Sequence, residues 1–228
     1  VLDSNDTQGI VTQAPSANHL AFEIYGKDAH AGATPENGIN AILLASRAIA
    51  GLHLGRIDSE TTANIGIIQG GLATNIVPKQ VTVKGEVRSH DENKLQTITD
   101  EIVAAFQKAI DTYEDPATEE GLPRLEVKVE SDFTRTFIPE DHPVVRLAFQ
   151  AAENLGQPMR TKTTGGGADA NIFFKNGIIT GVLGTGMCDM HSVQESIRLD
   201  DMITTAELLL EIVQLHANKP ELRIKPKL

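Results

Sequence analysis

The chain has 228 residues, a formal net charge of −11 and a single cysteine. This length allows one large domain or two modest ones, and one cysteine excludes both a disulfide framework and a zinc site built from cysteines. The acidic balance argues against nucleic-acid binding, which depends on clustered lysine and arginine. Charged residues interrupt the long apolar segments, and the first residues lack a signal-peptide pattern. We therefore expect a soluble, cytoplasmic protein without a membrane segment.

Four strand-like and two helix-like segments follow one another between residues 18 and 132. Alternation of apolar and polar residues indicates a strand, and apolar residues three or four positions apart indicate a helix. In chain order the segments are strand 20–24, helix 37–50, strand 63–68, strand 81–88, helix 95–109 and strand 125–129. This order predicts a ferredoxin-like βαββαβ fold, a split βαβ sandwich with both helices on one face of the sheet.

The remaining residues, 133–228, alternate helices with short apolar strands, which predicts part of an α/β layer. The fold class is thus α/β combined with α+β. The expected elements are helix 143–155, a short helix at 172–174, strand 178–183 and helix 200–217. The last helix has an apolar stripe that we expect to be buried, formed by Met202, Ile203, Ala206, Leu209, Leu210 and Val213.

Three places in the βαββαβ segment are candidates for chemistry. His30 stands among small residues where a strand leaves the sheet, a position suited to ligand contact, although an isolated loop histidine more often bonds its own backbone. Asn75 stands shortly before a proline, and by itself this pattern indicates only a turn. Arg88 either pairs with Glu86 or Glu23 or forms a fork for a substrate carboxylate, and the residues alone leave both open.

Two glycine-rich loops in the later part of the chain are further candidates. The first contains Gly166, Gly167 and Asp169. Its backbone amides suit a carboxylate or phosphate, with the aspartate capping the next helix, whereas the polar residues before it argue against a dinucleotide fingerprint. The second loop places His191 between a strand and a long helix. Imidazole is the commonest metal ligand, and Glu195 is spaced to orient its second nitrogen. The alternative is a loop that only connects the strand to the following helix, with Glu195 beginning a turn.

Taken together and in this order, these stretches resemble the co-catalytic zinc metallopeptidases of the aminopeptidase, aminoacylase and carboxypeptidase-G type. The resemblance is strongest to the peptidase T (tripeptidase) branch, and it extends from residue 1 to about residue 197. The matching stretches are Val1-Leu2-Asp3, His30-Ala31-Gly32, Asn75-Ile76-Val77-Pro78, Gly85-Glu86-Val87-Arg88-Ser89, Gly166-Gly167-Ala168-Asp169-Ala170-Asn171, and Gly184-Thr185-Gly186-Met187 with His191 and Glu195.

The resemblance implies a division of the chain. Residues 18–132 would be a lid and dimerisation domain that forms a homodimer, inserted into a zinc-binding α/β domain. Residues 1–17 would be the first piece of that catalytic domain and residues 133–228 its C-terminal piece. Two zinc ions in a complete site would polarise the scissile carbonyl and activate a bridging water, and a glutamate base would pass the proton to the leaving amine.

The resemblance also implies individual roles. Asp3 and His191 would each be a ligand of one of the two zinc ions. His30 would reach the site of the partner subunit and stabilise the oxyanion of the tetrahedral intermediate. The residues that would bind the substrate or shape its pocket are Asn75, Arg88, Gly166, Gly167 and Asp169.

The sequence departs from this family at the metal site. None of the seven histidines is followed two residues later by aspartate, and the one Glu-Glu pair, Glu119-Glu120, lies in a polar loop of the lid segment. We therefore predict a zinc-dependent aminopeptidase or tripeptidase that hydrolyses the N-terminal bond of short peptides, and expect this segment alone to be inactive. The alternatives are a non-catalytic dimerisation or peptide-binding module, and an amidohydrolase that acts on N-acyl amino acids.

Overall fold

A computed structural model of the chain describes residues 1–114 and 121–218, so Glu119-Glu120 lies outside the described residues. The chain divides into two compact units. The inner unit is Ser16–Asp132, and the outer unit is formed by Val1–Pro15 together with Phe133–Leu228. Each unit has its own sheet and its own hydrophobic core.

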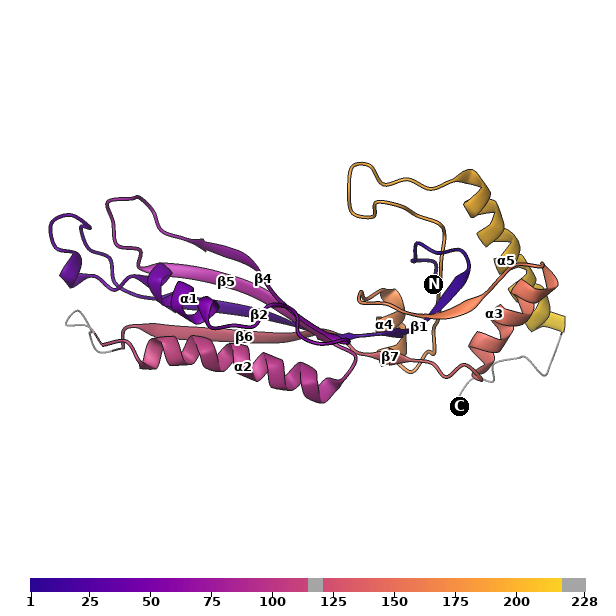
Figure 1. Cartoon of the computed structure of the whole chain (residues 1–228), viewed down its shortest axis with the longest axis horizontal. Coiled ribbons are helices and arrows are strands. Elements are labelled where there is room, and N and C mark those ends of the chain that lie inside the picture. Colours follow the sequence, from indigo (N-terminus) through magenta and orange to yellow (C-terminus); the bar gives the residue numbers. More distant parts are fainter. Residues whose placement is uncertain (115–120, 219–228) are drawn as a thin grey trace. The chain divides into compact units, whose positions relative to one another are not determined.

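The inner unit is a five-stranded sheet with two helices packed on one face (Figure 1). The strands, in the spatial order β3-β4-β5-β2-β6, are β2 (Ser16–Tyr25), β3 (Gly55–Arg56), β4 (Thr61–Gly70), β5 (Gln80–Ser89) and β6 (Arg124–Phe133). Both β2 and β4 pair with β5 in the antiparallel sense. This arrangement confirms the predicted ferredoxin-like class, with β3 as an additional short strand at the edge.

The inner core forms because β2, β4 and β5 present buried apolar side chains to the helices α1 (Ala41–Ala50) and α2 (Glu92–Asp111), with Leu125 of β6 packed against them. The short helix η1 (Pro35–Asn37) precedes α1. Asn40 caps α1 by accepting the Leu43 N–H at 3.0 Å, which satisfies one of the unpaired donors of the first turn. On the sheet, Phe22 stacks on Phe106 of α2 with ring centroids 3.9 Å apart.

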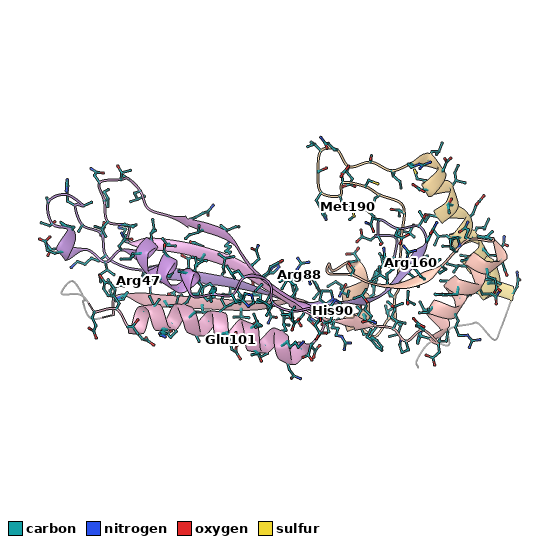
Figure 2. All side chains as sticks on the ribbon, in the orientation of Figure 1. Arg47, Arg88, His90, Glu101, Arg160 and Met190 are labelled. Carbon is teal, nitrogen blue, oxygen red and sulfur yellow. The ribbon has the colours of Figure 1, made fainter. Side chains whose placement is uncertain are left out.

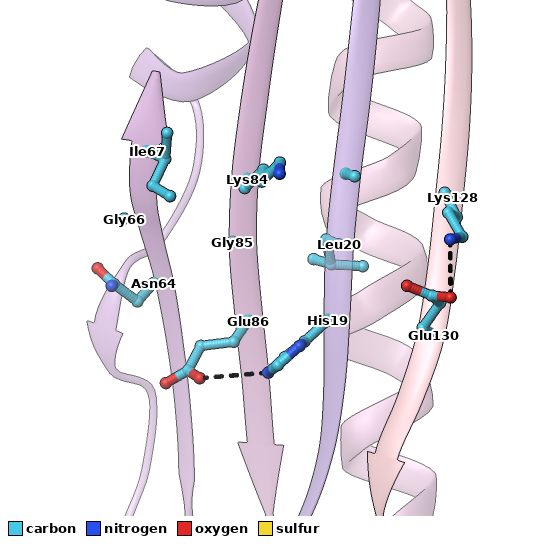
Figure 3. Close-up of a pocket in the computed structure, with 11 residues that line it drawn as sticks. His19, Leu20, Asn64, Gly66, Ile67, Lys84, Gly85, Glu86, Lys128 and Glu130 are labelled. Carbon is cyan, nitrogen blue, oxygen red and sulfur yellow. Dashed lines mark ion pairs between the residues drawn. The ribbon is translucent and has the colours of Figure 1, made fainter. Parts of the chain in front are cut away.

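The other face of the inner sheet is open and polar (Figure 3). It has a shallow hollow of about 470 Å³. His19 on β2 and Glu86 on β5 point toward one another across it, with 3.9 Å between Nε2 and Oε2. Lys128 and Glu130 pair along β6 at 2.8 Å. These four polar side chains line part of the face that the helices leave uncovered, together with apolar residues such as Ile67.

The outer unit contains a four-stranded sheet built around β1 (Gly9–Ala14). β1 pairs antiparallel with β7 (Thr136–Phe137) and β9 (Val182–Leu183), and parallel with β8 (Arg160–Thr163). The strand predicted at 178–183 is therefore limited to its last two residues. The helices of this unit are α3 (Pro143–Asn154), α4 (Asp169–Lys175) and α5 (Leu199–Asn218).

The predicted buried stripe of α5 is wrong for most of its members. Met202, Ile203, Leu210 and Val213 are exposed, whereas the side chains that enter the core with α3 are Leu208 and Leu215. The physical reason is that α5 is apolar around much of its circumference, so periodicity does not identify which face packs. Within residues 1–114 and 121–218, no helix combines the length and apolar composition needed to cross a membrane.

Candidate functional site

A cavity of about 350 Å³ in the outer unit brings together four of the predicted site residues. Its lining includes Asp3, Gly166, Gly167 and His191, which are separated by up to 188 positions in the chain. Asp169 is not part of this lining; it is the first residue of α4. The structure therefore places both predicted metal ligands and the glycine loop around one space.

Asp3 is held at the cavity by the end of the sheet. Its backbone N–H donates to the carbonyl of Leu183, the last residue of β9, at 3.1 Å, and Leu2 forms a parallel bridge with the same residue. Since β9 continues directly into the loop that carries His191, one strand end positions both candidate ligands.

The loop that carries His191 bends sharply and bonds to itself. Asp189 and His191 have φ values of 52° and 64°, which are uncommon for residues other than glycine. The base of the loop is closed by Cys188 and Ser196, whose backbones exchange hydrogen bonds of 2.9 and 3.2 Å. The Glu195 carboxylate accepts the backbone N–H of His191 at 3.0 Å. Glu195 therefore supports the histidine backbone, and the expected bond to its second ring nitrogen is not the one observed.

The glycine loop is fixed by a buried amide that the sequence analysis did not identify. Asn171 accepts the Ala168 N–H at 3.0 Å and donates to the Thr134 carbonyl at 2.8 Å. Ala168, and not Asp169, occupies the cap position of α4, so the predicted capping role of the aspartate is wrong. The signal for Asn171 was its place three residues after the cap, the position from which a polar side chain reaches back to the cap N–H.

Gly167 packs directly on the ring of Phe133. A Cβ atom at this position would lie 2.6 Å from Cζ of the ring, whereas one at Gly166 would have as its nearest neighbour the Thr164 hydroxyl at 3.9 Å. The two glycines therefore differ. Gly167 needs to lack a side chain so that the backbone can approach the Phe133 ring, whereas Gly166 has room for a methyl group.

In the inner unit, His30 and Asn75 lie on two loops joined by backbone hydrogen bonds. The Ala31 N–H donates to the Asn75 carbonyl at 2.9 Å. Nδ1 of His30 accepts the backbone N–H groups of Gly32 and Ala33 at 3.1 and 3.0 Å. The histidine does bond its own backbone, and because Nδ1 acts as an acceptor, the neutral ring carries its proton on Nε2. The exposed side chain therefore presents one N–H donor.

Arg88 pairs with Glu86 at 2.9 Å between Nη2 and Oε2, near the end of β5 (Figure 2). This is the structural alternative that the sequence left open. The ion pair with Glu86 occupies one nitrogen of the Arg88 guanidinium. The binding of a substrate carboxylate by the same side chain therefore stays a prediction.

The donors in the outer cavity do not by themselves fit a zinc site. Such sites use three or four protein ligands, and the cavity has Asp3 and His191. Over the described ranges 1–114 and 121–218, no cluster of three or more histidine, cysteine, aspartate or glutamate side chains could hold a metal ion.

Comparison with known proteins gives the following matches. A family profile described as a peptidase dimerisation domain matches residues 16–114. The uncharacterized protein YqjE of Bacillus subtilis is 38% identical over 93% of this chain and 56% of its own length. The solved structure of aminopeptidase PepT from Bacillus cereus has 36% identity and a TM-score of 0.80, and that of a tripeptidase from Staphylococcus aureus has 34% identity and a TM-score of 0.83.

Both structural matches cover 95% of this chain and 56% of the solved chain. The chain therefore spans little more than half the length of the relatives that it matches.

Proposed function

We propose that the chain, which is similar to an aminopeptidase PepT and to a tripeptidase, is part of a peptidase T-like exopeptidase that removes the N-terminal residue from short peptides. The observation that carries the proposal is the outer cavity, where Asp3, His191 and the Gly166-Gly167 loop line one space. These residues are far apart in the sequence, and the resemblance had assigned them to one site.

In this proposal the glycine loop and the inner unit bind and orient the peptide. The loop leaves room for the backbone of a peptide, and Asn75 and Arg88 hold its backbone and its terminal carboxylate. His30, supplied by the partner subunit, donates its Nε2–H to the carbonyl oxygen as negative charge develops there. Its tautomer suits this task, because Nδ1 already accepts two backbone N–H groups.

Zinc dependence is proposed for the complete enzyme only. Asp3 and His191 are two ligands where a zinc site needs at least three, so the complete enzyme needs further ligands and a general base beyond those that the described residues place at this cavity. For this chain alone we expect no stoichiometric zinc and no peptide hydrolysis.

The proposed partner of the inner unit is a second copy of the chain. β3 pairs only with Thr62 and Ala63 of β4, so the outer edge of β4 beyond them is open within the described part of this unit. Ile67 and Ile68 are exposed on that edge. An unpaired strand edge with apolar side chains is a template for pairing with another chain, and the matched profile is that of a dimerisation domain.

A chimera tests the proposed function. In the Staphylococcus aureus tripeptidase, which this chain matches at 34% identity, the matched part is replaced by the present chain. We expect the chimera to hydrolyse tripeptides faster than N-acetyl amino acids, and His30→Ala to lower kcat with little change in KM. A folded, dimeric chimera that prefers N-acyl amino acids would support an amidohydrolase, and one without either activity would support a binding module.

A further inference from the structure

The ion pair of Arg88 and Glu86 lies on the open face of the inner sheet. Side chains two positions apart in a strand point to the same side of a sheet, and Glu86 lines the hollow of that face. The two side chains are 29 and 33% exposed, and ion pairs that solvent reaches add little to the stability of a fold. A guanidinium, however, binds a carboxylate through a planar fork of N–H donors, so a neighbour that fixes its plane affects what it can bind.

The strands on either side of β5 give Arg88 uncharged neighbours. Ala17 of β2 and Thr62 of β4 lie opposite Arg88 in the register of the sheet, and opposite side chains are the ones that meet across strands. Neither alanine nor threonine can form an ion pair. These cross-strand neighbours therefore cannot orient the guanidinium by charge, whereas Glu86 on the same strand does so at 2.9 Å.

Glu86 is itself held by the neighbouring strand. His19 of β2 lies opposite it in the register, and the two side chains point toward one another with 3.9 Å between Nε2 and Oε2 (Figure 3). Nε2 of His19 lies 3.4 Å from Oδ2 of Asp132 as well. The carboxylate of Glu86 is thus approached by nitrogen atoms of two strands, which limits the directions that it can take.

We propose that Glu86 is a positioning residue that fixes the plane of the Arg88 guanidinium, so that Arg88 meets the terminal carboxylate of a short peptide in one orientation. Glu86 acts through Arg88 and does not itself contact the peptide. This inference rests on the proposed function for the substrate, and on the geometry of the open face for the contact between the two side chains.

The charge and the orienting effect of Glu86 act on peptide binding in opposite directions. Its negative charge offsets that of Arg88 and so weakens the attraction for a second carboxylate. Its hold on the guanidinium lowers the cost of ordering that side chain when the peptide binds. A positioning role requires the second effect to be the larger, so removal of Glu86 should weaken binding even though the site becomes more positive.

The kinetic test uses the chimera described above, with a tripeptide as substrate. Glu86→Ala should raise KM roughly three- to tenfold with little change in kcat, and Glu86→Gln, whose side-chain oxygen still accepts a hydrogen bond, should keep KM near that of the unaltered chimera. In an Arg88→Ala background, Glu86→Ala should have no further effect. Glu130→Ala is the matched control, because Glu130 is a carboxylate of the same open face that pairs with Lys128; it should leave KM unchanged.

A second measurement needs no activity and uses the isolated chain, whose variants are checked for folding by circular dichroism. Nitrogen-15 exchange spectroscopy measures how fast the Arg88 guanidinium rotates about its Cζ–Nε bond. We expect this rotation to be roughly three- to tenfold faster in Glu86→Ala and unchanged in Glu130→Ala.

The positioning role would be overturned by a KM that falls or stays the same in Glu86→Ala, by an equal rise in KM without Arg88, or by an unchanged rotation rate. An active chimera with one of these results would retain the proposed function. An inactive chimera, combined with faster rotation in Glu86→Ala, would reject the proposed function and leave the hold of Glu86 on Arg88 standing.

Discussion

Replacing Gly167 with alanine measures how tightly the cavity wall is built. The new methyl carbon would lie 2.6–2.7 Å from three ring carbons of Phe133, so either the ring or the loop has to move. Overpacking of this kind costs about 1–3 kcal/mol. Gly166→Ala is the matched control, because its methyl group meets nothing nearer than 3.9 Å. Both variants reduce the entropy of the unfolded chain by a similar amount, so the difference between them reports the contact.

The assay is urea unfolding of both variants followed by far-ultraviolet circular dichroism. We expect Gly167→Ala to be less stable than Gly166→Ala by about 1–3 kcal/mol, with the change confined to the transition of the outer unit. In a double-mutant cycle, Phe133→Ala should remove most of the penalty by deleting the ring. Equal midpoints for the two alanine variants, or a penalty that persists without the ring, would refute the assignment of the strain to this contact.

Three further predictions concern pH, the histidine loop and the dimer. The pKa of Asp58 is lowered from 3.8 to about 2, chiefly by the hydrogen bond from Lys94 and next by the backbone N–H of Glu60. Its stabilisation is therefore present above pH 3.8 and is lost as the pH falls towards 2, and thermal melts of Lys94→Met should show a smaller pH dependence in this range. Glu195→Ala should speed hydrogen exchange of the His191 amide at least tenfold and Glu195→Gln much less, since the amide oxygen still accepts; identical rates would reject the support role. Ile68→Lys should shift a dimer to monomer in light scattering, and an unchanged mass would exclude the β4 edge as the interface.

The inner unit could be predicted from the sequence because apolar and polar residues alternate along its central strands, β2 and β5. In β5, Val81, Val83 and Val87 are fully buried, as the alternation requires. A period of two leaves only one choice of face, and a slip of one residue would expose every apolar side chain. The ferredoxin-like class follows from the order of such segments.

The outer unit was predictable only in outline. In α5 neither the buried Leu208 nor the exposed Leu210 is distinguished by its neighbours, so a local pattern does not choose between them. The contacts of Asn171 and Glu195 depend on tertiary geometry. Asn171 donates to the carbonyl of Thr134, 37 positions away. Glu195 accepts the backbone N–H of His191, whose positive φ sets the direction of that N–H. The grouping of Asp3 with His191 came from a resemblance, because spacing alone does not join two residues at opposite ends of a chain.

The way the chain enters and leaves the inner unit has a consequence for modularity. β2 and β6, its first and last strands, are neighbours in the inner sheet, and β1 and β7, which flank it in the sequence, pair with Ala14 opposite Thr136. Each unit thus keeps its two connection points on adjacent strands, the condition under which a domain insertion is tolerated. A short turn between residues 14 and 136 would remove the inner unit without rerouting the outer sheet. A lineage could therefore exchange or lose the segment that carries His30, Asn75 and Arg88 as a whole, without rebuilding the sheet of the outer unit.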